Sequence, residues 1–270
     1  MNSESETTES ASPPAWPLIA PPPIISPPIP GAAPAQPAWS FWLTMAFSAA
    51  IAGAFIAVQV VVVVLLVVAY TAADRRFTVD ELKSDGLLLS IATCSTAPVV
   101  VGLSVFFAWL KRGLPVKEYL GLKPITLKAA FWSFASLIGV SFLWEAVVKV
   151  FGLQEIPEFM IEAFRTAKFL PLLWLALVVA APAAEECFFR GFLFQGLMLS
   201  RVGPVGAILI TSLLWAVIHL QYGWVEIAFI FLLGLLLGVI RFKSGSVWLS
   251  FLIHAASNLI ATVEMALLDY

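Results

Sequence analysis

The sequence predicts an all-α fold, a polytopic membrane bundle of about seven transmembrane helices. Hydrophobic residues make up 61% of the 270 positions and charged residues only 12%, whereas a soluble domain carries about 25% charged residues. The mean hydropathy of +0.97 agrees with this interpretation. Most of the apolar residues also fall in long runs, several of which reach the ~20 residues that cross a bilayer. We therefore expect a lipid bilayer around the protein and no nucleic-acid partner.

Composition divides the chain into three predicted parts. Residues 1–38 are rich in Pro and Ala and contain no Lys or Arg, so they lack the basic region of a signal peptide. Their prolines predict an extended, solvated tail, with a docking segment for a partner as the alternative. Residues 39–168 are predicted to hold the first membrane helices, and residues 169–270 a membrane core that carries the polar residues.

Three apolar runs predict the spans of the N-terminal half: Phe41 to Tyr70, Leu87 to Leu110 and Phe131 to Val150. Glu145 and Lys149 lie four residues apart in the third run, which predicts an ion pair on one helix face. The mixed segment from Pro157 to Lys168 predicts an amphipathic helix on the membrane surface.

Four further runs predict the spans of the core: Phe169 to Leu199, Val205 to Leu220, Ile227 to Ile240 and Val247 to Leu268. Pro182 is expected to kink or locally open the first of them. Gly234 and Gly238 are spaced as GxxxG, which predicts close helix packing. Lys and Arg are more frequent in the connections on the side of the N-terminus, which favours a multi-pass protein of the cell membrane with a cytoplasmic N-terminus.

Two adjacent carboxylates and an arginine, Glu185, Glu186 and Arg190, interrupt the fourth apolar run. One charge at the centre of a membrane helix costs roughly 2.5–3.5 kcal/mol on insertion scales. Three charges so close together therefore indicate a functional site. Glu186 and Arg190 lie four residues apart and can pair on one helix face. Glu185 is rotated by about 100° from Glu186 and remains available for chemistry.

Both histidines of the chain, His219 and His254, lie in predicted membrane helices. Trp215 precedes His219 by one turn, and Asn258 follows His254 on the same face. Ionisable residues inside a membrane mark functional sites by default. We expect Glu185, His219, His254 and Asn258 to converge on an active-site cavity formed by the last four helices.

These residues suit two chemistries, between which the pattern does not decide. In the first, Glu185 and His219 activate water, and His254 and Asn258 donate hydrogen bonds to the oxyanion of a peptide carbonyl. In the second, Glu185, His219 and His254 hold a zinc ion that lowers the pKa of bound water to about 7. The sequence thus leaves undecided whether the protein binds a cofactor, and zinc is the candidate. Because no HExxH motif is present, such a metal site would have to be assembled across helices.

Three motifs, in this order, resemble the CPBP family of intramembrane proteases, which includes the Rce1-type CAAX prenyl endopeptidases and the bacterial Abi-type proteins. The motifs are Glu185-Glu186-Cys187-Phe188-Phe189-Arg190, Trp215-Ala216-Val217-Ile218-His219 and His254-Ala255-Ala256-Ser257-Asn258. The resemblance covers roughly residues 169–268. The second motif departs from the family, because Trp215 stands where Phe is usual, and we expect this to alter the groove more than the chemistry.

The resemblance implies water activation by Glu185 and His219, oxyanion stabilisation by His254 and Asn258, and a structural role for Arg190. It favours an intramembrane hydrolase of the metalloprotease or glutamate type that cuts a membrane-associated protein or peptide, with a CAAX-type substrate as one candidate. Two alternatives remain. One is a non-catalytic bacteriocin-immunity or scaffold protein of the same fold. The other is an ion-coupled transporter, for which the chain shows no clear internal repeat.

Overall fold

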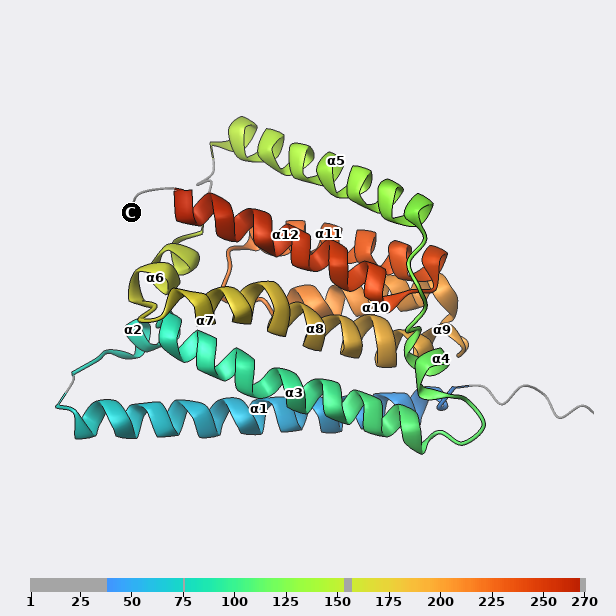
Figure 1. Cartoon of the computed structure of the whole chain (residues 1–270), viewed down its shortest axis with the longest axis horizontal. Coiled ribbons are helices and arrows are strands. Elements are labelled where there is room, and N and C mark those ends of the chain that lie inside the picture. The colour runs from blue at the N-terminus through green and yellow to red at the C-terminus, as the bar shows by residue number, and fades with distance from the viewer. Residues whose placement is uncertain (1–37, 75, 153–156, 268–270) are drawn as a thin grey trace, which may run out of the picture. The chain divides into compact units, whose positions relative to one another are not determined.

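The computed structural model describes residues 38–74, 76–152 and 157–267, and within these ranges the chain forms helices and no strands (Figure 1). The predicted tail, residues 1–38, lies outside the described residues except for Ala38. Residues 36–270 form one unit by their internal contacts. The predicted all-α bundle is confirmed.

The N-terminal half contains three long helices, α1 (Phe41–Ala72), α3 (Gly86–Leu110) and α5 (Leu127–Phe151), with the short helices α2 (Val79–Lys83), α4 (Val116–Leu120) and α6 (Glu158–Thr166) in the connections. Each long helix begins after a side chain that accepts a hydrogen bond from the first turn: Ser40, Asp85 and Thr126. The ion pair expected between Glu145 and Lys149 is present on α5, with a distance of 2.6 Å between Lys149 Nζ and Glu145 Oε1.

The fourth predicted span is continuous but is not a uniform α-helix. It consists of α7 (Leu170–Trp174), the π-helix η1 (Leu175–Ala180), α8 (Ala181–Glu185), the π-helix η2 (Glu186–Leu193) and α9 (Phe194–Met198). A π-helix has i→i+5 hydrogen bonds, and such segments are frequent at functional sites. Pro182 lies in the first turn of α8, directly after η1, which agrees with the expected local opening.

The last three helices are α10 (Gly203–Val217), α11 (Trp224–Ser244) and α12 (Val247–Leu267). Among the described residues six helices are long and apolar enough to span a bilayer, and α10 is a shorter apolar helix of 15 residues. At a rise of 1.5 Å per residue α10 is about 22 Å long. The prediction that His219 lies in a membrane helix is wrong. Helix α10 ends at Val217, and His219 lies in the turn that follows it.

The segment from α7 to α9 lies between two groups of helices (Figure 1). Helix α3 packs against η1, α8 and η2, with α1 behind it, and α12 packs against the same segment from the other direction. A Cβ atom added to Gly234 would lie 3.0 Å from Ser212 Cβ, and one on Gly238 would lie 3.1 Å from Ile208 Cγ2. The GxxxG prediction is thus confirmed as close packing of α11 on α10.

Candidate functional site

The ion pair expected within the fourth span is present at its centre. Arg190 Nη1 lies 3.0 Å from Glu186 Oε1, and both side chains are fully buried. Arg190 Nη2 also donates to the carbonyl oxygen of Gly234 on α11, at 3.3 Å. The guanidinium lies over the ring of Trp215, 4.7 Å from its centroid. Arg190 therefore connects η2 to both α10 and α11.

His254, on α12, lies between the two adjacent carboxylates. Its Nδ1 is 3.0 Å from Glu186 Oε1, and its Nε2 is 3.9 Å from Glu185 Oε2. An ionised carboxylate can only accept a hydrogen bond, so Nδ1 carries the proton and donates it. The separation from Glu185 is too long for a direct hydrogen bond. Nε2 is thus the nitrogen that faces Glu185 and is available for chemistry.

Trp215 contacts several members of this cluster and is almost completely buried. Its Nε1 donates a hydrogen bond to Glu185 Oε2. Its ring centroid lies 5.2 Å from that of His219 and 5.0 Å from that of His254, both in edge-to-face geometry. Trp215 therefore orients Glu185 and contacts both imidazoles.

His219 lies in the turn after α10 and is partly exposed. Its Nδ1 is 2.7 Å from the carbonyl oxygen of Trp215, which closes the last turn of the helix. Because a carbonyl only accepts, Nδ1 is the donor, and in the neutral ring Nε2 is left unprotonated. His219 thus has a free basic nitrogen at the edge of the cluster.

Asn258 lies one turn beyond His254 on α12, but its contact is with a different element. Its Nδ2 donates to the carbonyl oxygen of Leu177 in η1, at 2.8 Å. Within the described ranges, no hydrogen bond joins its side chain to Glu185, His219 or His254. A side-chain amide has two N–H donors, so one of them is still available to a ligand.

The residues predicted as zinc ligands do not fit a zinc site. Zinc binds His and carboxylate ligands at about 2.0–2.2 Å from one point. His254 Nε2 lies 3.9 Å from Glu185 Oε2, and the Trp215 ring contacts both imidazoles in edge-to-face geometry. In the part of the chain that the structure describes, no three His, Cys, Asp or Glu side chains are grouped to hold a metal ion.

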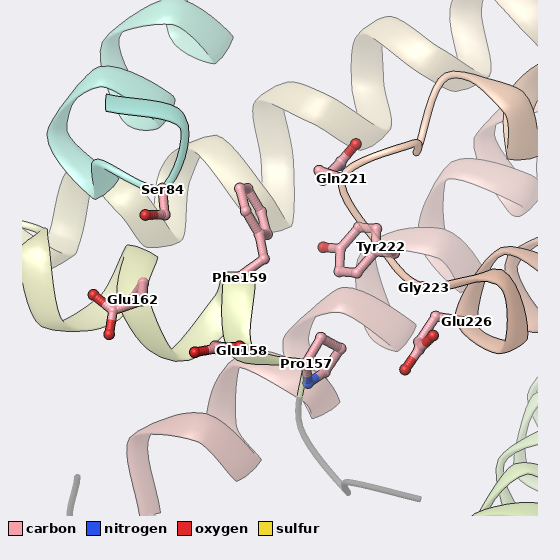
Figure 2. Close-up of a pocket in the computed structure, with 9 residues that line it drawn as sticks. All are labelled: Ser84, Pro157, Glu158, Phe159, Glu162, Gln221, Tyr222, Gly223 and Glu226. Carbon is pink, nitrogen blue, oxygen red and sulfur yellow. The ribbon is translucent and has the colours of Figure 1, made fainter. Parts of the chain in front are cut away.

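A pocket of about 390 Å³ lies beside the turn that carries His219 (Figure 2). It is bounded by the first turn of α6, the end of α2 and the start of α11, and its acidic residues are Glu158, Glu162 and Glu226. Figure 2 shows the Tyr222 phenol directed toward the pocket from the side opposite Glu158.

Tyr222 links this pocket to the cluster. Its ring stacks on His219 with centroids 6.2 Å apart, and its hydroxyl donates to Met160 Sδ at 3.3 Å. Burial, together with the negative charge of Glu185, raises the pKa of the Tyr222 phenol to about 12. Tyr222 was not predicted as a site residue, because an aromatic residue in a loop carries no signal of its own. The carbonyl acceptors at Leu177 and Gly234 could not be found from side-chain identity either.

Comparison with protein families bears on the same segment. Residues 167–260 match the family described as "Type II CAAX prenyl endopeptidase Rce1-like". No curated protein and no solved structure matches the chain. The matched range begins just before α7 and ends within α12, so it contains all three predicted motifs.

Proposed function

We propose that this multi-pass membrane protein is an intramembrane endopeptidase, because residues 167–260 match the Rce1-like family of type II CAAX prenyl endopeptidases. It hydrolyses a peptide bond in a membrane-associated protein or peptide, and a CAAX-type prenylated chain is the candidate substrate. The observation that carries the proposal is His254, held between Glu185 and Glu186 in the buried centre of the bundle.

In this proposal Glu185 is the general base. Trp215 Nε1 holds one of its oxygens, and the side chain is 20% exposed, so water can reach it. Glu185 takes a proton from that water as the oxygen attacks the carbonyl carbon of the substrate. His219, with its free Nε2, orients the same water. When the C–N bond breaks, the proton passes from Glu185 to the leaving nitrogen.

His254 and Asn258 are the proposed oxyanion donors. Since Nδ1 of His254 already donates to Glu186, Nε2 can donate to an oxyanion only if the ring carries both protons. Two carboxylates then face one imidazolium and one guanidinium, and the buried charges cancel, which lowers the cost of burying them. Asn258 supplies the second donor through its free amide hydrogen.

The test is cleavage of a farnesylated peptide ending in Cys-a-a-X by the purified protein in lipid vesicles. Glu185→Gln should lower kcat by roughly 10²–10⁴-fold, the usual effect of losing a general base. Glu145→Gln is the matched control, because Glu145 is an exposed carboxylate on α5 paired only with Lys149 among the described contacts. Full cleavage by Glu185→Gln would contradict the proposed role.

Two further arms of the experiment address the alternatives. Cleavage should persist in a chelator, because the proposed chemistry uses Glu185 and His219 to activate water and no three described His, Cys, Asp or Glu side chains are grouped to hold a metal ion. The non-catalytic hypothesis would be supported by two results together. The wild-type protein would cleave neither the prenylated nor the unprenylated peptide, and its biological function would survive Glu185→Gln. Cation transport that depends on Glu185, without cleavage, would favour the transporter.

A further inference from the structure

Arg241, in the last turn of α11, is a buried cation that the proposed chemistry does not use. Its residue is 4% exposed, and no carboxylate forms an ion pair with it among the described residues. A buried charge without an opposite charge is costly unless its donors are bonded. The acceptors of the Arg241 N–H groups therefore indicate the role of the side chain.

The donors of Arg241 reach the segment that carries the glutamates. Arg241 Nε donates to the carbonyl oxygen of Arg190 at 2.8 Å, and Nη2 lies 3.5 Å from Gln195 Oε1. The guanidinium also lies over the ring of Phe194, 5.5 Å from its centroid. The three partners belong to the end of η2 and the start of α9.

The connection after α4 fixes the guanidinium from the other side. Gly121 lies so close to it that an added Cβ would overlap Nη2 and Cζ of Arg241. The carbonyl of Gly121 accepts from the backbone N–H of Val247, at 2.9 Å, which holds this connection against the junction of α11 and α12. Arg241 thus has little space in which to move.

The bonded carbonyl lies within a π-helical segment, where the backbone ladder is displaced by one residue. The same arrangement occurs in the other π-helix, where Asn258 of α12 donates to the carbonyl of Leu177. In both cases a side chain from a neighbouring helix bonds a π-helical carbonyl. Irregularities in a helix have identifiable local causes. A side chain that inserts into the backbone hydrogen-bond ladder is one such cause.

We propose that Arg241 is a positioning residue: through the carbonyl of Arg190 it fixes the register of η2, and hence the placement of the Arg190–Glu186–His254 series. It does not touch the substrate. Its effect on turnover rests on the proposed peptidase function, whereas its effect on η2 does not.

The experiment compares Arg241→Ala and Arg241→Lys with Lys243→Ala, a matched control that removes an exposed cation from the same helical turn. The first readout is amide hydrogen exchange of the full-length protein in vesicles. Exchange across residues 186–195 should become at least tenfold faster in Arg241→Ala, and stay unchanged in Lys243→Ala. Unchanged exchange in Arg241→Ala overturns the proposal, whether or not the protein cleaves peptides.

The second readout is cleavage of the farnesylated peptide. Arg241→Ala should lower kcat at least tenfold with KM changed less than twofold, because substrate contacts remain while the catalytic groups shift. Arg241→Lys keeps the charge but cannot reproduce the Nε geometry, so it should fold and still lose at least fivefold in kcat. If Arg241→Ala does not fold, Arg241→Lys decides, and full turnover by Arg241→Lys overturns the proposal. Absence of cleavage in the wild type refutes the peptidase function and leaves the exchange result standing.

Discussion

At the scale of single residues, the neighbouring Glu185 and Glu186 both lie near His254 but differ in burial and in their hydrogen bonds. Glu186 is fully buried and bonded to Arg190 and His254 through one oxygen, whereas Glu185 is 20% exposed and bonded to Trp215. The first arrangement is that of a structural ion pair, and the second is that of a group that water can reach. Because the two residues differ in environment, substitution of Glu186 should mainly lower stability and substitution of Glu185 should mainly lower turnover.

Glu186→Gln should therefore destabilise the protein by about 3–5 kcal/mol, since it leaves the buried Arg190 without its opposite charge. Glu185→Gln should cost less stability and yet remove cleavage. Thermal unfolding in detergent, measured beside the peptide assay, separates the two effects. Equal stability of the two variants would contradict the assignment of Glu186 to the structural pair.

Tyr222 provides a test of how Glu185 and the pocket are connected. A phenolate is disfavoured by burial and by a nearby carboxylate, so both raise the pKa of Tyr222. Glu185→Gln removes only the second cause and should lower the Tyr222 pKa from about 12, while burial keeps it above the ordinary value. The ultraviolet difference titration between each background and its Tyr222→Phe variant measures this. An unshifted titration would show that Glu185 does not face Tyr222.

At the scale of elements, the α7–α9 segment shows which features of a helix the sequence can predict. Its ends agree with the predicted run from 169 to 199, because hydropathy changes sharply there. Its two π-helical segments were not predicted, since local composition does not show that their carbonyls accept hydrogen bonds from side chains of α11 and α12. Pro182 was the single local signal. It indicated a local opening of the helix but not that the helix becomes π-helical.

The contact of α9 with α1 predicts opposite effects for two glycine substitutions. A Cβ on Gly196 would overlap the side chain of Thr44, whereas one on Gly139 of α5 would meet no atom within 4 Å. Gly196→Ala should therefore destabilise the protein by about 1–3 kcal/mol through overpacking. Gly139→Ala should stabilise it by up to about 1 kcal/mol, the helix propensity gained. Thermal unfolding of the two variants in the same detergent tests this, and equal shifts would refute the close approach.

At the scale of the whole unit, hydropathy predicted where the helices lie, and three motifs predicted which of them carry the polar cluster. What the sequence could not show was the end of α10, because apolar residues such as Ile218 and Leu220 continue the run past the turn. Arg241 was also missed. It lies beside Lys243 at the end of an apolar run, where cations ordinarily reach toward the interface. Motif spacing also could not show whether the candidate zinc ligands come together, and among the described residues no three His, Cys, Asp or Glu side chains are grouped to hold a metal ion.

The helices alternate in direction, and the start of α1 and the end of α12 lie at opposite ends of the bundle (Figure 1). We therefore predict that tags placed before α1 and after α12 report opposite sides of the membrane. Protease accessibility in sealed vesicles of known orientation is the measurement. Two tags on the same side would show that α10 enters and leaves through one surface.

The length of α10 has a consequence for the surrounding lipid. At about 22 Å it is shorter than the hydrocarbon core of about 30 Å, so the bilayer beside it experiences hydrophobic mismatch. The lipid relieves such mismatch by thinning locally, which draws headgroups and their hydration toward the turn that holds His219. A bilayer of longer acyl chains would oppose this thinning and place the turn at greater depth. Turnover should then decrease with bilayer thickness, even though no residue of the protein has changed.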